Sequence, residues 1–591
     1  MHRRTIARSS LAAALALALA LSACSTTATG DDQPTAAEAG DAAAARESSP
    51  PAGDAGTQPE TDSGVDDGGV ETGNGAVTAG SGWMGTNLGV AAAFAEWAFI
   101  DAFKFSRPWV SGVAAGEGRQ PVWNDKRPLD LDDAGWVRSL LPDQIARTAM
   151  LTGPLPTRPA GRYVVLYEGQ GELSYTAGAS LVESGPGRDV LDVVDTAEIA
   201  INLVATDPDD YIRNIRVIMP GGVYATDPAT LVMEPDADRS DYLSFEEHYE
   251  SLIFHPHFLA SLQGYGSVRY MNWMLTNGSI VSEWDDRPKL DDARWTVDGV
   301  PVEIMVELSN RTATNPWFTL PHLATDEYVR NFGVAVRDNL LPGLTPYVEY
   351  SNEVWNTQFA QHEYSREQGL AAGLDDEPFA AAIAFYGRRS SEIFAVWEEV
   401  YGGGEGFVAV LGSKTSDPDA VSRLALESGE AAGADLLAVA GYFGGRANWA
   451  NNCDEVAAMS IDEFFDYLVD DSVPRAIDGI GRQIDVADDY GIALGIYEGG
   501  QHLRVNGCDG DDAKKEAIGD LFDAANRDPR MGDVYLEFFA AVDLAGVDLF
   551  SHYTNTGAWT RFGRFGAREH LLQSRSEMPK YDAIMTYAEQ S

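Results

Sequence analysis

Apolar and polar residues follow two different patterns along the chain. Short β-rich apolar runs recur from residue 82 onward, and stretches with apolar residues three or four apart lie between many of them. The runs are 82–90, 267–273, 300–308, 345–351, 407–413, 434–442, 491–500 and 546–553. Amphipathic helices are predicted between them at 326–341, 378–401 and 472–491, among others. Eight strands that alternate with helices predict a (β/α)8 TIM barrel, with a doubly wound open sheet as the alternative.

The long gap between the first two runs carries a different pattern. Residues 161–182 and 192–221 alternate apolar and polar side chains between Gly, Asp and Pro turns, without a helical period. This pattern predicts an antiparallel, sandwich-like β-domain at 151–235, inserted between strands 1 and 2 of the barrel. The barrel would then comprise 81–150 and 236–591. We expect the insert to support one side of an active-site cleft, with carbohydrate binding as the alternative.

The N-terminal residues indicate export. Residues 1–24 contain a basic start and an apolar run that is too short to span a bilayer, and they end in LSAC. We interpret them as a lipoprotein signal peptide with Cys24 as the lipid-modified residue; an ordinary signal peptide is the alternative. Residues 25–80 are rich in Ser, Thr, Ala, Gly, Pro and acid, which predicts a disordered acidic linker. The protein is therefore expected to be lipid-anchored at the outer face of the bacterial cell membrane.

Charge and missing motifs exclude several classes of function. With 91 acidic against 42 basic residues and a net charge of −49, the chain has no electrostatic attraction for nucleic acid. A neutral polysaccharide remains compatible as the partner, and we expect a monomer. No HExxH, GxSxG, P-loop or GxGxxG stands at a strand-to-helix turn, so no metal and no cofactor are predicted.

Two glutamates stand at the ends of predicted strands. Glu353 follows the fourth run in YVEYSNEVWN, and Glu498 ends the seventh in GIALGIYEGG. In a barrel the carboxyl ends of the strands meet at one face. Hydrolysis of a glycosidic bond needs two facing carboxyl groups, one protonated and one ionised. The pair therefore predicts a glycosidase, and Asn352 is expected to bind the sugar 2-hydroxyl. Glu349 is the alternative to Glu353 as the catalytic residue. Either glutamate taken alone is more typical of a solvated loop.

These motifs resemble a known clan. An Asn–Glu after the fourth strand and a Glu after the seventh are similar to the retaining β-glycosidases built on (β/α)8 barrels, which include cellulases, mannanases, xylanases and β-galactosidases. EYSNEVWN also resembles exported bacterial proteins described as cellulose-binding or glycosidase-like. The resemblance covers about residues 82–130 and 236–585. It implies that Glu353 is the general acid/base and Glu498 the nucleophile of an endo-acting, cellulase- or mannanase-like enzyme that retains configuration.

The same resemblance implies roles for four further residues. Arg269 would bind the nucleophile, His322 a sugar hydroxyl, and Tyr442 would orient the nucleophile. Trp559 would form a platform beneath the sugar. For each of the four, core packing or an ordinary loop position is the alternative.

Aromatic residues follow the predicted strands more often than core packing requires. Sugars stack on such side chains through their C–H faces, so the aromatics support a carbohydrate cleft without selecting the sugar. They are Trp273, Trp317, Trp355, Tyr442, Trp449 and Trp559.

Two cysteines remain besides Cys24. Cys453 follows the sixth predicted strand and Cys508 the seventh, so both lie in neighbouring loops of one barrel face. An exported protein meets an oxidising compartment, which predicts a disulfide between them, with two free thiols as the alternative.

A non-catalytic function is the main rival. The chain could be a surface-tethered polysaccharide-binding lipoprotein on a degenerate barrel, because a fold does not imply an activity. Retention of Glu353 and Glu498 together with Asn352 and Arg269 favours an enzyme. Transglycosylation would use the same residues and differ only in whether water or a sugar resolves the intermediate.

Overall fold

The computed structural model describes most of the chain from residue 82 onward. The described residues are 82–91, 95–114, 122–152, 159–194, 198–429, 433–445, 452–505, 508 and 510–590. The predicted signal peptide with Cys24, the linker at 25–80 and Trp449 lie outside them. Within the described part, no helix is long and apolar enough to cross a membrane.

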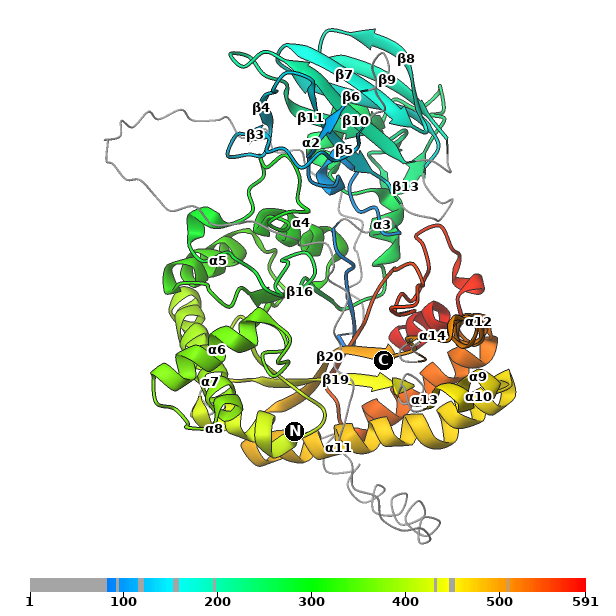
Figure 1. The fold of residues 1–591 in the computed structure, drawn as a ribbon. Helices are drawn as coiled ribbons and strands as arrows, with labels where there is room; N and C mark the ends of the chain where they lie inside the picture. Colours follow the sequence, from blue (N-terminus) through cyan, green and yellow to red (C-terminus); the bar gives the residue numbers. More distant parts are fainter. Residues whose placement is uncertain are drawn as a thin grey trace. The chain divides into compact units, whose positions relative to one another are not determined.

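Eight parallel strands close into a barrel (Figure 1). They are β1 (Met84–Asn87), β15 (Ser267–Arg269), β16 (Asn315–Leu320), β17 (Tyr347–Tyr350), β18 (Val408–Ser413), β19 (Leu436–Phe443), β20 (Ala493–Gln501) and β21 (Leu549–His552). Each pairs with the next, and β1 closes the ring by pairing with both β15 and β21. The closed ring confirms the TIM barrel and excludes an open sheet.

Helices follow the barrel strands along the chain. They are α4 (Val302–Thr312), α5 (Asp326–Asn339), α6 (Ala360–Ala371), α7 (Pro378–Tyr401), α8 (Leu424–Ser428), α9 (Cys453–Ala458), α10 (Ile461–Tyr467), α11 (Val473–Tyr490), α12 (Asp512–Arg527), α13 (Pro529–Ala545) and α14 (Pro579–Ala588). The predicted helices at 326–341, 378–401 and 472–491 correspond to α5, α7 and α11. Their apolar stripes are buried, as the helical period requires.

The third predicted strand is wrong. Residues 300–308 fall largely within helix α4, and the third barrel strand is β16, where a loop was expected. The run contains Val302, Met305 and Val306, whose three- and four-residue spacing buries one helix face. A short apolar run fits either period, and only the continuation of the helix to residue 312 separates the two. His322 nevertheless still follows the third strand.

The antiparallel strands between β1 and β15 begin earlier than predicted. They run from Val110 to Ser244, rather than from residue 151 to 235, because β2 pairs with β5 and β5 pairs with β10. Figure 1 draws them in blue to green-cyan. The strands are β2 (Val110–Val113), β3 (Asp130–Leu131), β4 (Val137–Ser139), β5 (Gln144–Met150), β6 (Gly161–Glu168), β7 (Gly171–Ala177), β8 (Ala179–Gly185), β9 (Arg188–Val193), β10 (Ile199–Thr206), β11 (Arg213–Ile218), β12 (Gly222–Tyr224), β13 (Asp227–Val232) and β14 (Tyr242–Ser244).

These strands form separate sheets outside the barrel. Two four-stranded sheets have the orders β2-β5-β10-β7 and β11-β6-β9-β8, and smaller sheets join β13-β12-β14 and β3-β4. Helices α2 (Phe245–Leu252) and α3 (Pro256–Ser261) follow them and lead into β15. Side chains of the sheets and of the barrel share one continuous apolar core.

A disulfide joins two loops that follow neighbouring barrel strands. Cys453 begins α9, after β19, and Cys508 follows β20; their Cα atoms are 5.7 Å apart. The bridge closes a loop between residues 55 apart in sequence. It therefore ties together two segments next to the carboxyl ends of β19 and β20.

We predict that replacing both cysteines by serine lowers the free energy of unfolding. The chain-entropy model gives a loss of about 4 kcal/mol for a loop of this length. Denaturant unfolding of the variant and the oxidised wild type measures the difference. Two thiols that react with a thiol reagent in the unreduced wild type would contradict the pairing.

Candidate active site

The turn after β17 places Glu353. Ser351 and Glu353 both have left-handed backbone conformations, with φ of 60° and 44°, which are unfavourable for residues other than glycine. Two backbone hydrogen bonds hold the turn: Ser351 N donates to Leu320 O and Asn356 N to Glu353 O, both at 2.8 Å. The strained turn leaves the Glu353 side chain buried, with 8% of the residue exposed.

A β-bulge in β20 places Glu498. Ile496 pairs with Val439 and Glu498 with Ala440, so Tyr497 is an extra residue opposite β19. In a regular strand neighbouring side chains point to opposite faces, but a bulge reorients them. Tyr497 and Glu498 consequently both lie near Arg269, inside the barrel. The next residue, Gly499, has no room for a Cβ atom, which would lie 2.6 Å from the oxygen of Gly441.

Arg269 is the centre of the cluster. It is 1% exposed, and its Nε and Nη2 donate to Glu349 Oε2 at 3.2 and 2.9 Å. Nη2 also donates to Asn352 Oδ1 at 2.9 Å, while Nη1 lies 3.9 Å from Glu498 Oε2. The resemblance implies that Arg269 binds the nucleophile. Its hydrogen bonds go instead to Glu349, Asn352 and Asn87, and its link to Glu498 is a longer ion pair.

Glu349 is therefore part of the charged cluster around Arg269. Its Oε2 also accepts a 2.9 Å hydrogen bond from Trp317 Nε1. Burial raises the pKa of Glu349, whereas the Arg269 charge lowers it. A buried carboxylate is retained only with such partners. The sequence signal for this pair is an arginine and an acid, Arg269 and Glu349, at inward positions of nearby strands.

An amide network fixes Asn352. Its Oδ1 accepts from Arg269, and its Nδ2 donates to Asn277 Oδ1 at 3.0 Å. Gln361 Nε2 donates to the same Asn277 oxygen at 2.7 Å and to the backbone oxygen of Asn352 at 2.8 Å. Both ends of the Asn352 amide are thus held by protein groups. A sugar hydroxyl at this residue would be an additional partner.

Glu353 and Glu498 have different partners. The Tyr497 hydroxyl donates to Glu353 Oε1 at 2.9 Å, and Asn356 Nδ2 donates to Oε2 at 3.3 Å. A hydrogen bond from Tyr442 and the Arg269 charge lower the pKa of Glu498. The predicted residues Arg269, Asn352, Tyr442 and the two glutamates are therefore brought together.

Burial raises the pKa of both glutamates. For Glu498, burial and the charge of Glu353 raise the pKa to about 8, against the effects of Arg269 and Tyr442. For Glu353, burial raises the pKa and the hydrogen bonds from Tyr497 and Asn356 lower it. We therefore expect Glu353 and Glu498 to share one proton near neutral pH. The raised pKa of Glu498 was not anticipated for a nucleophile.

The predicted aromatic residues Trp355, Trp273 and Trp317 lie in different surroundings. Trp355 lies at the cluster, with its ring 6.3 Å from those of Tyr386 and Tyr497. Trp273 packs in the core against Phe258, with ring centroids 5.9 Å apart, and is 1% exposed. Trp317 is a strand residue of β16 rather than a loop residue, which corrects its predicted position.

Two further predicted residues have neighbours of other kinds. Trp559 is half-buried, with Arg527 and Lys580 within 4.8 Å of its ring centre. The His322 ring contacts Tyr364, and burial lowers its pKa to about 4, so it is neutral. Both residues thus follow barrel strands, and their ring contacts are with Arg527 and Lys580 for Trp559 and with Tyr364 for His322.

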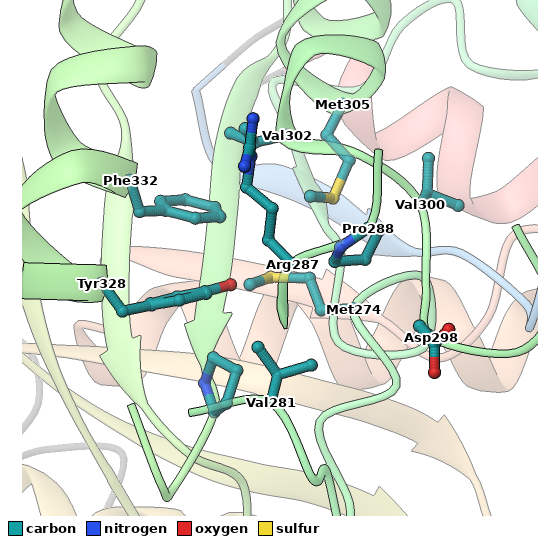
Figure 2. Close-up of a pocket in the computed structure, with 11 residues that line it drawn as sticks. Met274, Val281, Arg287, Pro288, Asp298, Val300, Val302, Met305, Tyr328 and Phe332 are labelled. Carbon is teal, nitrogen blue, oxygen red and sulfur yellow. The ribbon is translucent and has the colours of Figure 1, made fainter. Parts of the chain in front are cut away.

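Two hollows lie apart from the glutamates. Figure 2 shows a cavity of about 10 Å³ in which Phe332, Tyr328 and Met305 surround the side chain of Arg287. Its volume holds about one water molecule and excludes a sugar. An open groove of about 550 Å³ is lined by Glu283, Thr325, Asp326, Tyr364 and Arg389, among others.

Comparisons with known proteins give weak likenesses. The chain matches no protein-family model and no functionally curated protein. The solved structures similar to it include a GH51 arabinofuranosidase from Xanthomonas axonopodis pv. citri, with 11% identity and a TM-score of 0.32 over 51% of this chain and 60% of that chain. Native xylanase10C from Cellvibrio japonicus has 9% identity and a TM-score of 0.31 over 82% and 98%. A modular endo-β-1,4-mannanase from Cellulomonas fimi has 12% identity and a TM-score of 0.26 over 54% and 64%. The barrel is assigned from the strand pairing of this chain itself.

We predict that Glu498→Gln stabilises the protein at alkaline pH. The folded pair of Glu353 and Glu498 keeps its shared proton up to about pH 8, the value to which burial and the Glu353 charge raise the pKa of Glu498, whereas in the unfolded chain a glutamate loses its proton near the ordinary pKa of 4.5. The free energy of unfolding of wild type therefore falls as pH rises between these values, by up to about 1.4 kcal/mol per pH unit. The variant lacks the part of this loss that Glu498 contributes.

Denaturant unfolding at pH 5 and pH 8 measures the difference. We expect the stability of Glu498→Gln relative to wild type to be greater at pH 8 than at pH 5. Glu516→Gln, which changes an exposed glutamate of α12, is the control and should show no such gain. If the free energy of unfolding changed with pH in the same way in all three proteins, the raised pKa of Glu498 would be contradicted.

Proposed function

We propose that this protein is a glycoside hydrolase that cleaves β-linked polysaccharide with retention of configuration, acting within the polymer as cellulases and mannanases do. The supporting observation is the position of Glu353 and Glu498. They stand after the fourth and at the seventh strand of a closed barrel, buried, and share the neighbours Arg269 and Tyr497. Two carboxyl groups that hold one proton between them are what this reaction requires.

The neighbours of each glutamate support different roles. Arg269 and Tyr442 favour an ionised Glu498, which suits attack on the anomeric carbon. Glu353 would give the shared proton to the leaving oxygen. Attack turns the carboxylate of Glu498 into a neutral ester, which removes the charge that opposes ionisation of Glu353. Glu353 can then accept a proton from the water that releases the sugar.

A polymer substrate suits the predicted location of the protein. We propose that Cys24 carries the lipid anchor, that residues 25–80 act as a tether, and that the barrel lies outside the cell. A polysaccharide cannot enter a cell intact, so it is degraded outside the cell. The acidic chain favours an uncharged polymer, and Trp355 offers an aromatic face near the pair.

We also propose that the antiparallel sheets form a sandwich-like domain that supports the loop after β15. Lys104 Nζ donates to the backbone oxygens of Leu290 and Asp292, at 3.1 and 2.7 Å. Thr296 Oγ1 donates to the oxygen of Ser106 at 2.6 Å. These contacts connect the segment that leads into the sheets with the loop between β15 and α4.

We predict that both glutamates are needed for turnover. Reducing-sugar release from a panel of β-glucans, mannans, xylans and galactans should occur with wild type on at least one polymer. Glu353→Gln should lower the rate by about 10²–10⁴-fold, the usual contribution of a general acid. Glu498→Ala should lower it at least as much, and Glu516→Gln should not change it.

Binding to the same polymers completes this test. Variants that bind the polymer but do not cleave it agree with the proposal. If wild type binds a polymer as tightly as both variants and none of the three cleaves it, the protein is instead a tethered binding lipoprotein.

We predict a bell-shaped dependence of kcat/KM on pH. Activity needs one proton in the pair, so it should rise as the first carboxyl ionises. It should fall again above about pH 8, where the coupled pair of Glu353 and Glu498 loses its remaining proton. Initial rates between pH 4 and 10 measure both limbs. A flat profile over this range would contradict a catalytic carboxyl pair.

A further inference from the structure

Tyr497 contacts both halves of the charged cluster. It is 1% exposed, and its hydroxyl donates to Glu353 Oε1 at 2.9 Å. The Arg269 guanidinium lies 4.8 Å from the centre of its ring, which is a cation–π contact. Its backbone oxygen accepts a 2.9 Å hydrogen bond from Asn87 Nδ2. The side chain and the main chain of this residue are therefore held by separate partners.

The bulge is the reason why Tyr497 reaches Glu353. As the extra residue of β20, it lies on the same side as its neighbour Glu498 instead of pointing outward. One strand thus supplies the nucleophile of the proposed reaction and the hydroxyl that binds the acid. Burial and the nearby carboxylates raise the pKa of Tyr497 well above its ordinary value, so the hydroxyl remains a donor.

The two oxygens of Glu353 are bound unequally. Oε1 accepts the 2.9 Å bond from the Tyr497 hydroxyl, and Oε2 accepts a 3.3 Å bond from the Asn356 amide. A proton on a carboxyl oxygen weakens the hydrogen bond that this oxygen accepts. The loss is smaller at Oε2, which accepts the longer bond, than at Oε1. Oε2 is therefore the oxygen better suited to carry the proton.

We propose that Tyr497 is a positioning residue for the acid/base: its hydroxyl holds Oε1 of Glu353, so that Oε2 carries the proton to and from the substrate. The proposal rests on the proposed glycosidase function. The hydroxyl also stabilises the ionised form of Glu353, which the second half of the reaction needs. Tyr497 thereby limits how far burial raises the affinity of Glu353 for its proton.

Other charged and titratable groups also act on Glu353. They are Arg269 on β15, Glu349 on β17, Tyr442 on β19, Glu498 on β20 and Tyr553 after β21. Replacing Tyr497 by phenylalanine changes none of them and keeps an aromatic ring beside Arg269. The substitution therefore isolates the hydroxyl.

The test compares Tyr497→Phe with wild type and with Tyr270→Phe. Tyr270 is equally buried, but its hydroxyl bonds to Met305 O and Ser309 Oγ, away from the glutamates. Loss of a hydrogen bond to a charged group should move the alkaline limb of kcat/KM upward by about one to two pH units in Tyr497→Phe. Tyr270→Phe should leave both limbs in place. A purely structural role would lower rate or stability without moving the limb.

A second measurement does not depend on turnover. Infrared spectroscopy follows the protonated carboxyl band of Glu353, assigned by its loss in Glu353→Gln, as pH is raised. We expect its midpoint in Tyr497→Phe to be higher than in wild type by the same one to two units, and unchanged in Tyr270→Phe.

The two measurements separate the possible failures. Turnover with an unshifted limb and an unshifted midpoint would overturn the role of Tyr497 and leave the proposed function intact. A shifted midpoint without turnover on any polymer would support the action of Tyr497 on Glu353 and contradict the proposed function.

Discussion

The buried charge of Arg269 is the constraint on which the site depends. A guanidinium inside a barrel is stable only with anionic partners, and Glu349 supplies the nearest one. That pair is close to neutral and leaves Glu353 and Glu498 without a full counter-charge of their own. Two further carboxylates cannot both ionise easily in this interior, so they retain a proton between them. The charge balance of the barrel core thus supplies the proton that the proposed acid catalysis needs.

Local backbone geometry then decides where that proton can act. The left-handed turn at Glu353 and the bulge at Tyr497 are each less favourable than regular structure. The continuous apolar core that surrounds the barrel strands offsets such costs. Both irregularities direct side chains from strands β17 and β20 toward one point. A regular strand in either place would separate the residues that contact each other here.

The parts of the fold that depend on local pattern could be predicted from the sequence. Seven of the eight barrel strands follow from apolar runs. The residues at two strand ends predict Glu353 and Glu498 as the catalytic pair, which stays a prediction. The run at 300–308 failed because a short apolar stretch satisfies both the strand and the helix period. The Arg269–Glu349 pair was missed because it depends on which inward positions of β15 and β17 meet across β16. The inward position of Tyr497 depends on a bulge, for which the sequence carries no clear signal.

Trapping a covalent intermediate would show whether Glu498 is the nucleophile of a retaining glycosidase, because only a retaining enzyme forms such an intermediate. The protein would be incubated with 2-deoxy-2-fluoro-β-glycosyl fluorides of the gluco, manno, xylo and galacto series and then digested for peptide mass spectrometry. We expect one sugar to add its mass to the peptide that contains Glu498, and Glu498→Gln to remain unlabelled. Label on a different carboxylate, or no label on a wild-type protein that hydrolyses a polymer, would contradict this expectation.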